Sequence, residues 1–228
     1  MSRIRAYDRR RILEEAEQAQ RRGQTRKVIR LYRWVLAVER NNPQLHARLA
    51  PLLARTGEDF DAWVSFRRCA ETALREKREE RALALYRDAT RALPREIQAW
   101  QSLAHLLARR GEDREALAVL LEGSRHFRSR KLRSRAIHLL RRSRVIDAWH
   151  PECVLELARL LARTSQREEA LILLQGLAGR SEGVALRRVR GAQVRIEGSL
   201  GACWRWLRCL ITSGQEPSSG HLRPDSAL

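Results

Sequence analysis

Apolar residues recur at intervals of three and four along most of the chain, which is the spacing of one face of an α-helix. The segment 97–127, IQAWQSLAHLLARRGEDREALAVLLEGSRHF, carries two such apolar stripes on either side of Gly111. Ala, Leu, Arg and Glu dominate the composition and aromatic residues make up only 5% of it, which favours helix over strand. The pattern predicts an all-α protein.

The helical pattern repeats at a constant interval. LLARTGED at 52–59 returns as LLARRGED at 106–113 and, less completely, as LLARTSQR at 160–167. We call the interval from residue 52 to residue 106, which equals that from 106 to 160, the repeat step. Two registers of small or apolar residues follow the same step: Ala62, Ala116 and Ala170 in one, and Val28, Ala82 and Ala136 in the other. Because self-similarity at a fixed period indicates a repeat architecture, we expect one structural unit to be used three times.

The two registers alternate between a longer spacing, from Val28 to Ala62, and a shorter one, from Ala62 to Ala82. On a single helix, which turns by about 100° per residue, the shorter spacing would put Ala62 and Ala82 on nearly opposite faces, so a break must separate them. Gly23 lies one repeat step before Lys77 and indicates where the break falls. In the clearest copy we predict three helices, at 43–55, 59–76 and 79–93. The sequence leaves open whether these helices pair as two-helix repeats or form a three-helix repeat.

Three residues at or within the predicted helices carry expectations of their own. Asp59 and Asp113 stand at helix starts, where a carboxylate can cap free backbone N–H groups and interact favourably with the helix dipole. Pro51 lies inside a helical stretch and lacks a backbone donor, so we expect it to kink or shorten that helix.

The segment 97–127 resembles a tetratricopeptide repeat (TPR). The residues that carry the resemblance are Trp100, Leu103, Ala104 and Leu107 before the turn, Gly111 at the turn, and Ala116, Leu120 and Gly123 after it. Related patterns extend over roughly residues 10 to 178. The resemblance implies a right-handed α-solenoid of about 10 to 12 antiparallel helices, in which each repeat contacts its neighbours.

Composition changes after residue 178, and the change suggests three regions. Residues 1–178 are the predicted TPR-like domain. Residues 179–212 are richer in glycine but contain IEGSLGACWRWLRCL (196–210), which aligns with IDAWHPECVLELARL (146–160) and places Trp204 over Val154 and Leu207 over Leu157. We interpret 179–212 as a degenerate terminal repeat, and we expect the Pro, Gly and Ser-rich tail 213–228 to be disordered.

TPR-like proteins usually act as scaffolds whose stacked helices form a groove for another protein, so the resemblance implies an adaptor without catalytic activity. The groove positions that it transfers to the clearest repeat are Gln98, Gln101, His105, Ala108 and Arg109, with Arg55 and Arg163 as the counterparts of Arg109. Recurrence of the three arginines is also what descent from a duplicated unit would produce.

The net charge of +19 changes the picture, because it makes an anionic partner a reasonable hypothesis. Almost all of the excess is arginine, which genome composition could also produce. The stretch 124–146 contains nine basic residues and no acid, and on a helix four of them would form one strip: Arg130, Arg133, Arg141 and Arg144. The predicted partner is another protein, with an acidic segment as the candidate ligand. The alternative is a nucleic acid gripped through its phosphates, and the sequence favours the protein because no regular row of stacking aromatics accompanies the arginines.

Catalytic, metal and membrane motifs are missing from the sequence. No Gly-rich phosphate loop, G-x-S-x-G or H-E-x-x-H motif is present, so we expect no enzyme activity and no cofactor. His150 and Cys153 are three residues apart, but such a pair more often packs than binds metal. The four cysteines lack C-x-x-C spacing and are expected to be reduced. No apolar stretch is long enough for a membrane helix and no leader is evident, so a cytoplasmic location is expected.

Overall fold

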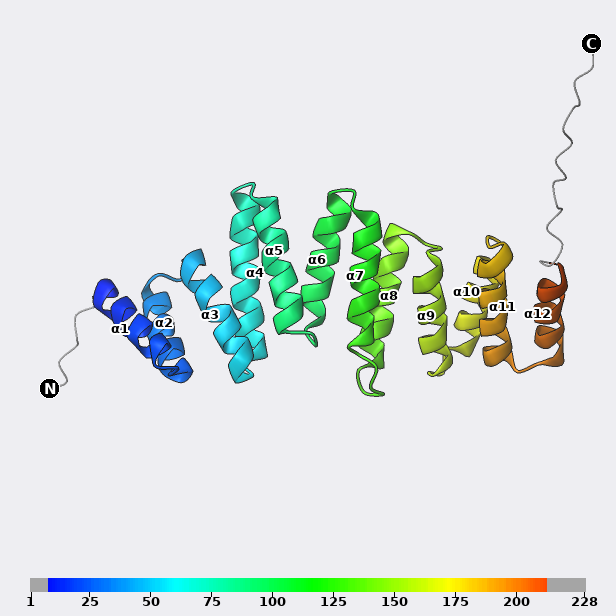
Figure 1. Ribbon diagram of the computed structural model, residues 1–228, viewed down its shortest axis with the longest axis horizontal. Coiled ribbons are helices and arrows are strands. Elements are labelled where there is room, and N and C mark those ends of the chain that lie inside the picture. The colour runs from blue at the N-terminus through cyan, green and yellow to red at the C-terminus, as the bar shows by residue number, and fades with distance from the viewer. Residues whose placement is uncertain (1–7, 213–228) are drawn as a thin grey trace, which may run out of the picture. The chain divides into compact units, whose positions relative to one another are not determined.

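The computed structural model describes residues 8–212, and this part of the chain contains twelve α-helices and no strand. The described residues form two compact units, the first ending at Arg142 and the second beginning at Ser143. The helices, labelled in Figure 1, are α1 (Arg9–Arg21), α2 (Thr25–Val38), α3 (Pro43–Thr56), α4 (Asp59–Arg75), α5 (Glu79–Ala92), α6 (Ile97–Arg109), α7 (Asp113–Arg125), α8 (Arg133–Ile146), α9 (Pro151–Ala162), α10 (Arg167–Ala178), α11 (Gly183–Glu197) and α12 (Leu200–Thr212). The predicted all-α fold class is confirmed.

Helix boundaries follow the sequence pattern closely. The three helices predicted at 43–55, 59–76 and 79–93 are α3, α4 and α5, each within a residue of its expected ends. We call α2–α4 the first triplet, α5–α7 the second and α8–α10 the third. Corresponding helices begin one repeat step apart in all three; α2, α5 and α8, for example, begin at positions 25, 79 and 133. This correspondence describes helix positions; the origin of the triplets from one repeated unit stays a prediction.

In the first unit, each helix from α1 to α7 packs against the next, and α3 also contacts α5. Figure 1 shows α4, α5, α6 and α7 as neighbouring columns that alternate in direction. The two predicted registers form the centre of these contacts: Val28, Ala62, Ala82 and Ala116 are each no more than 1% exposed. Small side chains at these positions let neighbouring backbones approach, and larger residues such as Leu53 and Leu107 fill the space around them.

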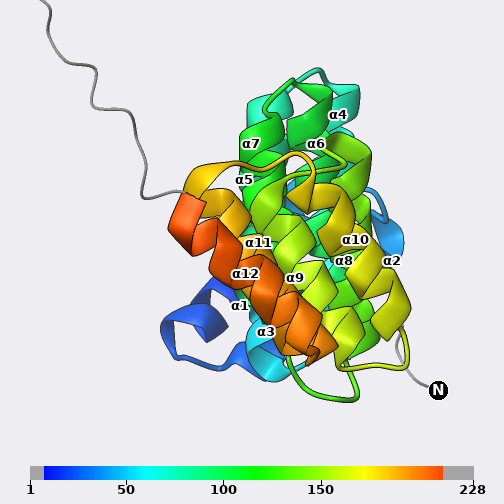
Figure 2. The ribbon, with the colours of Figure 1, turned by 90° about the vertical axis from the view of Figure 1, so that its right-hand side faces the viewer.

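In the second unit, α9 packs on α10, α10 on α11 and α11 on α12, and α9 also contacts α11. Figure 2 views the molecule from the end that carries α12. The alignment of this helix with α9 does not extend to burial: Val154 and Leu157 are fully buried, whereas Trp204 is 64% and Leu207 44% exposed. The predicted disordered tail, 213–228, lies outside the described residues, and the predicted domain boundaries at 178 and 212 stay predictions.

The turns between helices explain the break that the shorter spacing, from Ala62 to Ala82, required. Gly57 and Gly111 end their helices with φ of 80°, a left-handed conformation that costs glycine little. Lys77, between α4 and α5, also has a positive φ, of 59°, at the position that corresponds to Gly23. The predicted break therefore lies where Gly23 indicated it.

Two local expectations need correction. Pro51 does not shorten α3, which continues through it to Thr56, because one missing backbone hydrogen bond is outweighed by a buried face that includes Leu49 and Leu53. A kink at Pro51 stays a prediction. Asp59 does not cap α4, since it is the first helical residue and the cap position is Glu58, whose side chain makes no capping bond. Asp59 and Asp113 instead place negative charge in the first turns of α4 and α7, where the helix dipole favours it.

Candidate partner-binding surfaces

The groove residues predicted in the clearest repeat lie on one face of α6. Gln98, Gln101, His105 and Arg109 are spaced by three and four residues, which brings them onto one side of a helix. His105 and Arg109 are exposed and Gln101 is half-buried. Gln98 is exposed, yet its Oε1 accepts a hydrogen bond of 2.7 Å from Trp63 Nε1 on α4. Gln98 therefore also joins two helices, and the other three residues are available to a ligand.

Arg55, Arg109 and Arg163 are all exposed and stand at equivalent helix ends. Arg55 lies in the last turn of α3, Arg109 in the last turn of α6, and Arg163 directly follows α9. A cation near a helix C-terminus interacts favourably with the helix dipole, typically by about 0.3–1 kcal/mol. Within residues 8–212, Arg55 and Arg109 form no ion pair. The helix dipole is therefore a structural reason for an arginine at these helix ends, while the charges of Arg55 and Arg109 remain open to an external anion.

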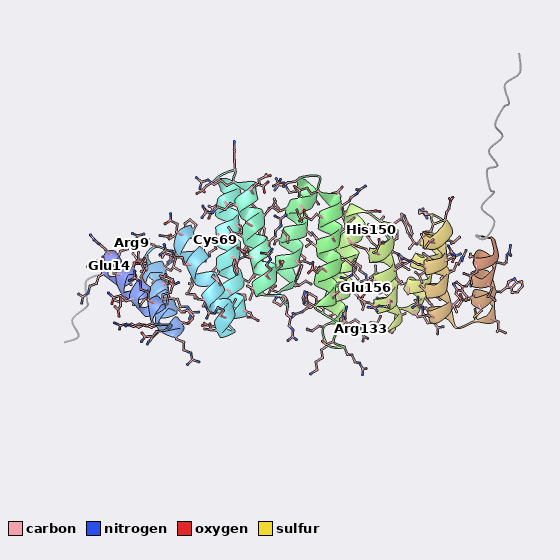
Figure 3. All side chains as sticks on the ribbon, viewed as in Figure 1. Arg9, Glu14, Cys69, Arg133, His150 and Glu156 are labelled. Carbon is pink, nitrogen blue, oxygen red and sulfur yellow. The ribbon has the colours of Figure 1, made fainter. Side chains whose placement is uncertain are left out.

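The four residues of the predicted arginine strip do not all lie on one helix. Arg130 lies in the turn before α8, because this helix begins at Arg133. Arg133, at the first position of the helix (Figure 3), is half-buried. Arg141 is exposed, but Arg144 is half-buried, donates from Nε to the Ala148 carbonyl at 3.3 Å and lies over the Trp149 ring. The strip expected from helical periodicity is therefore wrong at Arg130 and partly occupied at Arg144.

A hollow of about 500 Å³ opens between α5, α6 and α7, a volume within the range of sites for small ligands, about 300–1,000 Å³. Its floor is Trp100 and Leu103 of α6, with Arg87 and Arg91 on the α5 side and Val119 and Glu122 on the α7 side. His126 completes it by stacking on Trp100, with ring centroids 5.3 Å apart. Trp100 and Leu103 lie on the opposite face of α6 from His105 and Arg109.

The Trp100 ring is held in place from two sides. Its Nε1 donates a hydrogen bond of 3.1 Å to the carbonyl of Pro94, in the turn that precedes α6. On α7, a Cβ added to Gly123 would lie 2.7 Å from the Trp100 ring, so the close packing of ring on helix requires glycine here. The floor of this hollow is consequently rigid.

A smaller hollow, of about 170 Å³, occupies the corresponding place in the first triplet. It shares three positions with the larger one, since His46, Arg68 and Thr72 precede Trp100, Glu122 and His126 by one repeat step each. The His46 Nε2 lies 3.0 Å from the Arg40 carbonyl, which can only accept, so Nε2 carries the proton. This bond repeats the one from Trp100 to Pro94.

In the third triplet a tryptophan side chain fills this place. Trp149 lies in the turn before α9, and its ring packs so closely on Gly176 of α10 that an added Cβ would overlap it. The guanidinium carbon of Arg180 lies 4.2 Å from the ring centroid, and that of Arg144 lies 5.7 Å from it. Gly176 and Arg180 follow Glu122 and His126 by one repeat step. Arg144 likewise follows Thr90 by one repeat step, so the residues that the indole contacts correspond to three residues that line the larger hollow, while Val154 stands at the position of Trp100.

The sequence pattern predicts neither hollow. Trp63 and Trp100 are buried, whereas Trp34 and Trp204 are 41% and 64% exposed. The available signal was the pair of hydrogen-bonding rings, His46 and Trp100, at equivalent positions of successive triplets. What surrounds these two rings follows only from their contacts with neighbouring helices.

Within residues 8–212, no cluster of three or more His, Cys, Asp or Glu could hold a metal ion. Burial raises the pKa of Cys69 to about 11, and its thiol donates to the Pro43 carbonyl at 3.2 Å. Burial likewise raises the pKa of Cys153. Over the same residues, no helix has both the length and the apolar character needed to cross a membrane.

Comparison with protein families and with curated proteins gives no match. Solved structures do match. Nearly identical TPR-like repeats assigned to a kinesin light chain of Podosopora anserina share 17% identity, with 90% of this chain and 94% of that chain covered and a TM-score of 0.39.

Two further TPR proteins give similar values. One from Parabacteroides merdae shares 12% identity, with 93% of this chain and 94% of that chain covered and a TM-score of 0.34. TTC0263 from Thermus thermophilus shares 16%, with 93% of both chains covered and a TM-score of 0.33. At these identities and TM-scores the similarities are reported as likenesses of helical arrangement, and the TPR-like character predicted from residues 97–127 stays a prediction.

Proposed function

We propose that this chain is a non-catalytic scaffold that binds another protein through the α6 face and the neighbouring arginines, with an acidic segment as the preferred ligand. The observation that carries the proposal is the exposure of Arg55 and Arg109 at equivalent helix ends, where neither is neutralised by an acid within residues 8–212. Beside Arg109, His105 and Gln101 add donors on the same face.

The test is capture of the partner from nuclease-treated lysate by the wild-type chain and by the variant Arg55→Glu/Arg109→Glu. The matched control is Arg26→Glu/Arg30→Glu, which makes the same change in net charge at exposed positions of α2. We expect the first variant to weaken capture of one defined protein at least about tenfold, which corresponds to roughly 1.4 kcal/mol. We expect the control to retain most of it.

Two results would contradict the proposal. Equal losses in both variants would mean that binding follows net charge alone. Capture that disappears on nuclease treatment and falls steeply with salt would favour the alternative from the sequence, a nucleic-acid partner. A second set of variants changes other predicted arginines, to which the proposal gives a smaller role: Arg163, Arg130, Arg133 and Arg141.

A further inference from the structure

We infer that the hollow between α5, α6 and α7 is a second site, which binds an aromatic side chain of a partner protein. The inference rests on the proposed function in one respect, namely that the aromatic ring is presented by a protein. It concerns a different face of α6, however, because Trp100 and Leu103 line the hollow while His105 and Arg109 lie opposite.

The third triplet shows what fits this place. There the Trp149 indole lies against Gly176 and beneath the guanidinium group of Arg180, which is itself held by a hydrogen bond of 2.9 Å from Nη1 to the Gly176 carbonyl. Arg144 approaches the ring as well, at 5.7 Å. A flat ring flanked by cations is stabilised by burial and by cation–π attraction.

In the second triplet no indole comes from the turn before the helix. Arg95 stands where Trp149 stands in the third triplet, in a turn of the same form directly before a helix, and it is exposed and does not line the hollow. The apolar and aromatic floor of Trp100 and Leu103 remains, and Arg91 and His126 supply groups that stack on a ring or attract its face.

The first triplet gives the contrast. Its hollow is about 170 Å³ against about 500 Å³, and polar groups such as Asn41, Arg68 and Thr72 line it. The Arg68 guanidinium already has a partner within the chain, since its Nη1 donates to the Arg40 carbonyl at 3.2 Å. We therefore assign the aromatic site to the second triplet only.

The experiment uses the fluorinated probe N-acetyl-5-fluorotryptophanamide with the full chain, followed by ¹⁹F NMR and by the methyl resonances of Val119. The key variant is Arg95→Trp/Glu122→Gly, which transfers the arrangement of Trp149 and Gly176 to the second triplet. We expect the wild type to bind the probe saturably with a shift of Val119, and the variant to bind at least tenfold more weakly. An upfield ring-current shift of Val119 in the free variant shows that the new indole is seated.

The matched control, Arg95→Ala/Glu122→Ala, removes the same two side chains without adding a ring, and it should retain probe binding within about threefold. Trp149→Ala is the reciprocal variant, which empties the third triplet and should gain a second binding event for the probe. Failure of the wild type to bind, or equal losses in the control and the key variant, would overturn the inference. The inference would also be overturned if adenosine monophosphate, and not the indole probe, shifted the Val119 methyl resonances.

The two proposals fail separately. Arg55→Glu/Arg109→Glu should leave binding of the indole probe unchanged, because both residues lie outside the hollow. If the wild type captures its partner through the α6 face but does not bind the probe, only the aromatic site is overturned. If the wild type binds the probe but does not capture a partner through the α6 face, only the proposed scaffold surface is overturned.

Discussion

The second and third triplets place their helices at the same chain intervals but treat one space differently. Between α5 and α7 the space is open above Trp100, and in the third triplet Trp149 closes it against Gly176. The helical framework needs buried small residues at set positions, such as Ala116 and Ala170, and these are the same in both. The two triplets differ here at one turn position, Arg95 against Trp149, and at helix positions that include Glu122 against Gly176 and Trp100 against Val154. The positions that build the helical framework are therefore different from the positions that determine which side chains surround this space.

The largest expected effect comes from removing the Trp100 ring, which forms the floor of the open hollow. Trp100 is 5% exposed, and truncation of a buried Trp to Ala typically costs about 3–5 kcal/mol. We expect Trp100→Ala to lower the free energy of unfolding by an amount in this range, measured by urea denaturation. Trp204→Ala, at a 64% exposed position, should change it by less than about 0.5 kcal/mol. Similar costs for both would contradict the assignment of Trp100 to the core.

The closed site is tested by a cycle of two substitutions. Gly176→Ala puts a methyl group into the Trp149 ring, and overpacking of this kind typically costs about 1–3 kcal/mol. In the Trp149→Ala background the same substitution should be neutral or stabilising, because Ala favours helix by up to about 1 kcal/mol over Gly. An unchanged cost in that background would show that the ring and Gly176 do not meet.

A surface ion pair shared by the first two triplets should contribute less. Arg87 pairs with Glu115 at 2.8 Å, and Arg33 pairs with Asp61 at the corresponding positions. All four side chains are between 38% and 51% exposed, and such pairs are worth about 0.2–1 kcal/mol. A double-mutant cycle of Arg87→Ala and Glu115→Ala should give a coupling energy in this range that decreases in high salt. A coupling above about 2 kcal/mol would contradict it.

The smallest predicted effect is a change in the pKa of one carboxyl group, that of Glu58. The Arg33 guanidinium donates a hydrogen bond to Glu58 and attracts its charge, which lowers the pKa of Glu58 below 4.5. Because the folded-state pKa is the lower one, the stabilisation is present above the unfolded value and is lost as pH falls through the folded value. Arg33→Gln should raise the pKa of Glu58 in a ¹³C NMR titration, and Arg87→Gln should leave it unchanged.

Much of the fold was predictable because helix formation follows local periodicity. The short spacing between Ala62 and Ala82 required a break, and Gly23 located it at Lys77, where the backbone has a positive φ. Local rules failed where neighbouring groups intervene. Pro51 did not end α3, because the buried face of that helix holds it together, and Asp59 does not cap α4.

The candidate surfaces were predictable only in part. Helical spacing correctly brought Gln101, His105 and Arg109 to one face of α6, since it depends on one helix alone. It placed Arg130 on α8, which starts only at Arg133. It also could not assign Arg144 to the Trp149 ring or Gln98 to Trp63, because these contacts depend on side-chain directions in different elements.

The sequence by itself determined that the chain is helical, where the helices at 43–55, 59–76 and 79–93 begin and end, and which positions recur at the repeat step. These properties depend on the order of apolar, small and turn residues over a few helical turns. Only the tertiary structure decided that Trp149 meets Gly176 and Arg180, while the equivalent space above Trp100 stays open. The physical reason is that packing joins side chains from separate helices and turns, and one large or absent side chain there decides between a filled core and a binding site.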